Sequence, residues 1–110
     1  MRYIQLLSLI SLLATSSTYA AMESSSLICK TEAVKEAHKL LAFYRDNDDR
    51  IVIDDKVTPL AKITNPANEK QLLDVLETWG YIYKGRYRMR LIYSFDCTLM
   101  GEEILEYASL

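Results

Sequence analysis

The sequence predicts a small α+β domain in which two amphipathic helices pack on a short antiparallel sheet centred on residues 86–96. Polar and apolar side chains alternate over this stretch, and two earlier segments carry apolar residues at helical spacing. An all-helical bundle is the alternative, because Arg, Met and Leu in the run 86–91 are good helix formers. The eight tyrosines and the strict alternation favour the sheet.

The first 20 residues have the pattern of a cleaved secretory signal. Arg2 precedes an apolar run over residues 4–14, and small residues lead to an expected cleavage after Ala20. The run is too short to cross about 30 Å of hydrocarbon, so we expect removal and no membrane span after processing. The mature protein is then periplasmic or secreted, with a flexible leader over 21–26 and a single domain over 27–110.

Two cysteines, Cys29 and Cys97, remain after this cleavage. An exported protein with an even cysteine count usually forms disulfides, and two cysteines allow one pairing. The bond would close most of the mature chain and contribute roughly 4 kcal/mol by restricting the unfolded state. We therefore expect a Cys29–Cys97 disulfide that joins the start of the first helix to the end of the long strand.

The first helix is expected over residues 31–45, with Thr31 as its N-cap. The polar run 46–49 ends it, because short polar side chains favour turns. This run lacks the glycine and the bidentate glutamate of an EF-hand loop, so we expect no metal site. The apolar face of the helix consists of Ala33, Ala37, Leu40, Leu41 and Tyr44.

Short extended segments follow the first helix. Residues 50–53 are rich in β-branched side chains and predict a strand. Residues 57–63 continue extended, but Pro59 cannot donate a ladder hydrogen bond. We therefore expect this segment at a sheet edge or in a loop.

A second helix is expected to begin at Asn65, which caps it, with Pro66 at its first position. Leu72, Val75, Leu76 and Trp79 would line one of its faces. Gly80 would end it in a left-handed cap. Trp79 should then be buried where the helix meets the sheet.

The long strand is preceded by a hairpin. Lys84-Gly85 is its expected two-residue turn, since Gly accepts positive φ, and Ile82 would lie opposite Tyr87 on the apolar face. The odd residues from 87 to 97 would be buried. After Cys97, we expect residues 102–108 to form a helix rather than a closing strand, because their apolar side chains share a helical face.

The composition limits the classes of function. Loss of Arg2 with the signal changes the formal charge from −2 to −3, which argues against a nucleic-acid partner. His38 is the sole histidine and has no nucleophile at a useful spacing, and the sequence holds no phosphate-binding loop or zinc motif. We therefore expect a non-catalytic protein without a cofactor.

One feature favours binding. Residues two apart on a strand share a face, so three arginines would form a row of forked donors flanked by two tyrosines. The competing interpretation is a solvated face whose arginines pair with the aspartates of segment 46–55. The predicted protein-binding residues are Tyr81, Tyr83, Arg86, Arg88 and Arg90.

This surface predicts an acidic protein partner. The protein would then be an exported binding module of the inhibitor or immunity type, acting in the periplasm. The alternatives are an accessory or structural subunit of an envelope assembly, which would expose a strand edge, and a small hydrolase that uses carboxylates.

Overall fold

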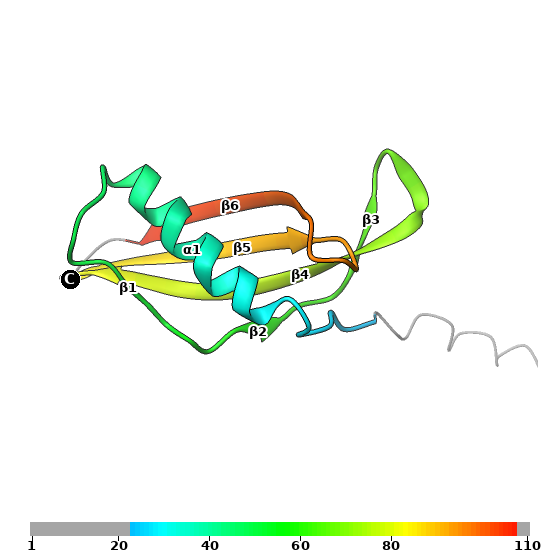
Figure 1. Ribbon diagram of the computed structural model, residues 1–110, viewed down its shortest axis with the longest axis horizontal. Coiled ribbons are helices and arrows are strands. Elements are labelled where there is room, and N and C mark those ends of the chain that lie inside the picture. The colour runs from blue at the N-terminus through cyan, green and yellow to red at the C-terminus, as the bar shows by residue number, and fades with distance from the viewer. Residues whose placement is uncertain (1–22, 108–110) are drawn as a thin grey trace, which may run out of the picture.

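The computed structural model describes residues 23–107. The expected signal peptide lies outside the described residues. The described chain contains one helix and six strands, coloured along the chain in Figure 1. They are α1 (Lys30–Tyr44), β1 (Val52–Ile53), β2 (Thr58–Pro59), β3 (Ile63–Asn65), β4 (Asn68–Ile82), β5 (Gly85–Tyr93) and β6 (Leu99–Tyr107).

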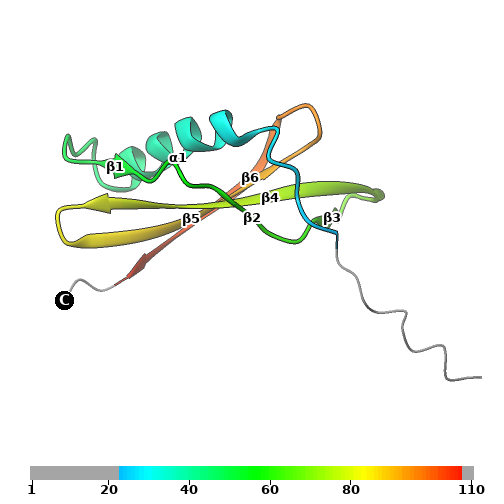
Figure 2. The same ribbon diagram turned by 90° about the horizontal axis from the view of Figure 1, so that it is seen from below.

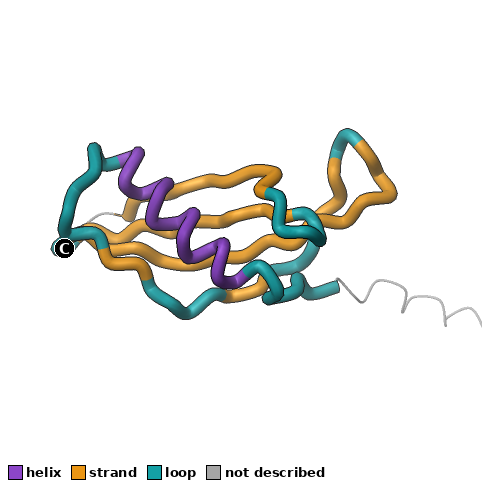
Figure 3. The backbone as a smooth tube through the Cα atoms, in the orientation of Figure 1, coloured by secondary structure: helices purple, strands orange, loops and turns teal. Residues whose placement is uncertain are grey.

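All strands pair antiparallel in one sheet. β4, β5 and β6 lie side by side, while β1, β2 and β3 pair with the other edge of β4 in succession. The short edge strands and the long central ones are seen in orange in Figure 3. The α+β class with an antiparallel sheet agrees with the prediction, but the centre of the sheet is β4 with β5, and only one helix is present in the described chain.

α1 covers one face of this sheet, as Figure 2 shows. Ala33, Ala37 and Leu41 recur every fourth residue and are fully buried against the sheet. The helix agrees with the predicted one except at its start, where Cys29 rather than Thr31 is the N-cap and makes no side-chain capping bond. The predicted alternation is confirmed within β5, whose buried residues are Tyr87, Met89, Leu91 and Tyr93. The strand ends at Tyr93, however, and Phe95, which was also expected to be buried, lies in the following turn and is 83% exposed.

The second predicted helix is wrong. Asn65 forms a hairpin turn instead of a helix cap: its Oδ1 accepts a hydrogen bond from the Ala67 N–H at 2.9 Å, and its side-chain amide donates to Gln71 at 2.8 Å. The following residues form β4, which pairs with strands on both of its edges. Val75 and Leu76 point to opposite faces and are both buried, so the apolar pattern of β4 imitates a helical stripe.

Gly80 lies inside β4 and is not a helix cap. It has no positive φ. A Cβ atom at this position would lie 2.7 Å from Leu41 Cδ2 and 2.9 Å from Met89 Cε. Gly80 therefore allows the C-terminal half of α1 to approach the sheet closely.

The C-terminal helix is also wrong, because residues 99–107 form β6. This strand pairs with β5 along nearly its whole length, with Met89 opposite Ile104. A helix there would leave the outer backbone groups of β5 without ladder partners, whereas the strand satisfies them. Ile104 thereby adds to the core beneath α1.

The expected leader makes specific contacts. The Ser25 N–H donates to the Leu60 carbonyl at 2.8 Å, and Ser25 Oγ accepts from the Val75 N–H at 2.7 Å. Ser26 N–H donates to the buried Asp74 carboxylate at 2.9 Å. The folded region therefore begins before Leu27. Pro59, in contrast, lies where expected, in the edge strand β2.

Cys29 and Cys97 form the predicted disulfide, with their Cα atoms 5.5 Å apart. It joins the start of α1 to the turn between β5 and β6. Such a bond is compatible with an extracellular or periplasmic location. In the part of the chain that is described, no helix combines the length and apolar character needed to span a membrane.

Candidate functional site

The face of β4–β5–β6 that points away from α1 is here called the open face. Figure 2 shows that no helix of residues 23–107 covers it. The strand registers place its side chains in three adjacent rows across the sheet. The rows are Tyr81–Arg86–Tyr107, Trp79–Arg88–Leu105 and Glu77–Arg90–Glu103.

Four of the five predicted site residues lie on this face. The three arginines alternate with the buried residues of β5, and Tyr81 lies directly opposite Arg86. The hairpin turn is one residue earlier than predicted, so Ile82 pairs with Gly85 and not with Tyr87. The earlier turn changes which residues lie opposite each other on β4 and β5. It does not change the face of the sheet on which each side chain lies, because the alternation along both strands is preserved.

Tyr83 is the predicted residue that does not join the others. It occupies the hairpin turn with a φ of 54° and is 76% exposed. There it lines a hollow of about 300 Å³ together with Arg45, Arg50 and Tyr87. This hollow lies at the tip of the β4–β5 hairpin rather than among the arginines of the open face.

The partners of the arginines lie within the sheet itself. Glu77 Oε2 lies 2.9 Å from Arg90 Nε and 3.7 Å from Arg88 Nε, and its side chain is only 16% exposed. Glu103 Oε2 lies 4.0 Å from Arg90 Nη1. Two of the three guanidinium groups are therefore neutralised by glutamates from neighbouring strands.

The acidic segment 46–55 is not the partner that the competing interpretation assumed. Asp48 pairs with Arg50 at 2.7 Å, and this hydrogen-bonded ion pair lowers the pKa of Asp48 to about 2. Among the described residues, the carboxylates within 4.0 Å of the open-face arginines belong to Glu77 and Glu103.

An aromatic pair supports the remaining arginine. The rings of Trp79 and Tyr107 have centroids 5.2 Å apart. Arg86 Cζ lies 5.5 Å from the Trp79 centroid and 5.8 Å from that of Tyr107. Arg88 also approaches Tyr107, donating a hydrogen bond to its hydroxyl at 3.4 Å. Trp79 is thus half-buried on the open face and does not belong to the buried core, whereas it was predicted to be a core residue between the second helix and the sheet.

Five residues of the open face were missed by the sequence prediction. Trp79 and Glu77 continue the alternation that Tyr81 begins, and this signal would have been found had β4 been interpreted as a strand. The β6 residues likewise occupy every second position. The missed residues are Glu77, Trp79, Glu103, Leu105 and Tyr107.

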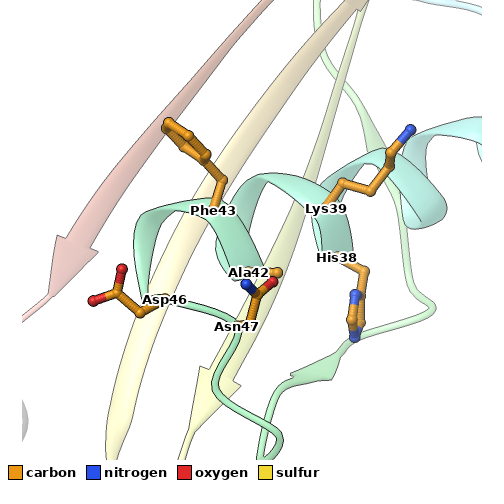
Figure 4. Close-up of a pocket in the computed structure, with 6 residues that line it drawn as sticks. All are labelled: His38, Lys39, Ala42, Phe43, Asp46 and Asn47. Atoms are coloured by element: carbon orange, nitrogen blue, oxygen red, sulfur yellow. The ribbon is translucent and has the colours of Figure 1, made fainter.

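A second hollow of about 500 Å³ lies on the outer side of α1 and contains His38. Figure 4 shows that the His38, Phe43 and Asp46 side chains point in different directions, so they do not converge on one ligand position. Within residues 23–107, no group of three His, Cys, Asp or Glu residues is placed to hold a metal ion. The hollow is lined by His38, Lys39, Ala42, Phe43, Asp46 and Asn47.

No protein-family model, curated protein or solved structure matches this chain.

Proposed function

We propose that this chain is an exported, non-catalytic binding module of the inhibitor or immunity type, and that its open face binds an acidic protein in the periplasm. The observation that carries the proposal is the gathering of Trp79, Tyr81, Tyr107 and Arg86 on the sheet face that α1 leaves uncovered. Trp, Tyr and Arg are the residues most enriched at binding hot spots, because they combine large contact areas with polar groups.

The dimensions of the face suit the centre of an interface. Three rows and three strands cover about 14 Å by 10 Å. A stable interface buries about 800 Å² on each partner, so the partner would extend beyond these rows onto the surrounding rim. The exposed side chain of Leu105 lies next to Arg88 and adds apolar area to this centre.

The charge of the face favours an acidic partner. The face carries three arginines and two glutamates, so its net charge is positive although the formal charge of the whole chain is −2. Opposite charge on the partner would raise the association rate at low salt. The disulfide and the signal-like N-terminal sequence support action outside the cytoplasm.

A structural subunit is the second candidate, and the outer edge of β6 favours it. Within the described residues, β6 pairs with β5 on one side only, so its other edge is available to a further strand. The strand β6 carries the negative charges of Glu102, Glu103 and Glu106. Antiparallel pairing between the β6 strands of two copies would therefore bring like charges together. Sedimentation as a monomer at high concentration is therefore expected, and a stable dimer would favour the structural subunit.

Site-specific photo-crosslinking in the native host tests the proposal. A photoreactive amino acid replaces Tyr81 on the open face or, as a matched control, His38 on the outer side of α1. We expect the Tyr81 probe to form a discrete protein adduct that the His38 probe does not form. Equal adducts from both positions, or none from Tyr81, would contradict the proposed binding face.

A further inference from the structure

We infer that Arg86 is the anchor of the open face and that it binds one side-chain carboxylate, from Asp or Glu, of the protein partner. The inference rests on the proposed function and specifies the chemistry by which the partner is recognised. It assigns different roles to three arginines that the sequence alone presents as equivalent.

The ion pairs of the open face are distributed unevenly among its three arginines. Glu77 and Glu103 pair with Arg88 and Arg90. Among residues 23–107, no carboxylate lies within 4.0 Å of Arg86, whose side chain is exposed. The positive surplus of the face is therefore concentrated at Arg86.

Aromatic rings hold the Arg86 guanidinium in position. It lies near the rings of both Trp79 and Tyr107. This contact restricts the side chain without using its N–H groups, so the forked donors remain available to an acceptor. Because part of the ordering cost is met before binding, a carboxylate gains more from such a group than from a freely rotating one.

The donor geometry of Arg86 matches a carboxylate ligand. A planar guanidinium binds a carboxylate through two parallel hydrogen bonds, which a lysine ammonium cannot reproduce. A docked protein would also exclude water from the site, which strengthens both the ion pair and the contact with the aromatic rings. A carboxylate carried by a protein surface therefore fits this site.

Titration with hexaglutamate at low salt tests the anchor directly, using protein expressed from the full sequence with its disulfide formed. NMR follows the Arg86 Nε–Hε resonance, and hexaglutamine is the uncharged reference peptide. We expect hexaglutamate to shift this resonance. We also expect Arg86→Gln to weaken hexaglutamate binding about tenfold and Arg86→Lys to weaken it about threefold or more.

Lys39→Gln is the matched control, because it removes one positive charge from a side chain that is 77% exposed on α1. It should change the hexaglutamate affinity by less than about twofold. The inference is overturned if Arg86→Gln binds as wild type does, if Lys39→Gln loses as much affinity as Arg86→Gln, or if wild type does not distinguish the two peptides. Full affinity in Arg86→Lys would overturn the forked carboxylate contact.

Crosslinking separates this inference from the proposal on which it rests. If the Tyr81 probe still captures its protein in the Arg86→Gln background with unchanged yield, the binding face stands and Arg86 is not its anchor. If the Tyr81 probe captures nothing in the wild-type background, the proposed function itself fails.

Discussion

At Gly80, α1 and the sheet approach each other closely. An added methyl group would contact Leu41, Met89 and Ile53 at 3.0 Å or less. We expect Gly80→Ala to lower the free energy of unfolding by about 1–3 kcal/mol, because side chains must move to accommodate it. Gly101→Ala is the control, since its nearest contact would be Ile92 at an ordinary 3.5 Å. Urea denaturation of both variants tests this, and equal losses would contradict the close approach.

The three arginines should also differ in their effect on stability. Arg90→Gln removes the closest partner of the largely buried Glu77 carboxylate, and we expect it to cost about 1–2 kcal/mol. Arg86→Gln removes no ion pair within the described chain and loses only the exposed contact with Trp79 and Tyr107, so it should cost less than about 1 kcal/mol. Thermal melts of both proteins provide the comparison. A larger loss in Arg86→Gln would show that Arg86 is structural.

At the scale of the elements, the disulfide connects α1 to the β5–β6 turn across a sequence separation of 68 residues. Replacing both cysteines by Ala frees the unfolded chain, so we expect a loss of roughly 4 kcal/mol. Urea denaturation of the double variant against the oxidised protein measures this loss. A difference below about 1 kcal/mol would mean that packing alone holds the two elements together.

The contact between α1 and β6 should depend on pH. Partial burial, and secondly the nearby Glu36 carboxyl, raise the pKa of Glu102 in the folded protein. Its contribution to stability is therefore complete below the usual glutamate pKa and is lost as the pH rises through the raised value. At neutral pH, the melting temperature of Glu102→Gln should exceed that of the wild type by up to about 4 °C. At acidic pH, the two proteins should melt at the same temperature. A lower melting temperature for Glu102→Gln than for wild type at neutral pH would show that the ionised Glu102 carboxylate does not destabilise the fold.

The sequence correctly predicted the elements that bury one face and expose the other. α1 and β5 each bury one face, so their periodicity of apolar residues is visible. β4 is covered on both faces near Val75 and Leu76, and it pairs along both edges, so its pattern does not separate strand from helix. β6 is a strand because of its pairing with β5, and no local preference in its sequence predicts that contact.

At the scale of the whole molecule, the open face depends on register between distant segments. The arginines and Tyr81 could be found because they belong to a single hairpin. Trp79 and Tyr107 come together only when β4 and β6 are aligned on the two sides of β5. The aromatic support of Arg86, on which the proposed recognition depends, therefore required the tertiary structure.

Charge reversal at Arg86, combined with the Tyr81 photo-crosslinker, tests the binding face most directly. The yield of the protein adduct and the melting temperature are measured for Arg86→Glu and for the unmodified sequence. We predict that the adduct yield falls about tenfold or more, because a carboxylate would then meet an acidic partner. The melting temperature should change by less than about 4 °C, since Arg86 is exposed and lacks an ion pair within the described chain. An undiminished adduct yield from a stably folded Arg86→Glu protein would contradict the recognition of an acidic partner by this face.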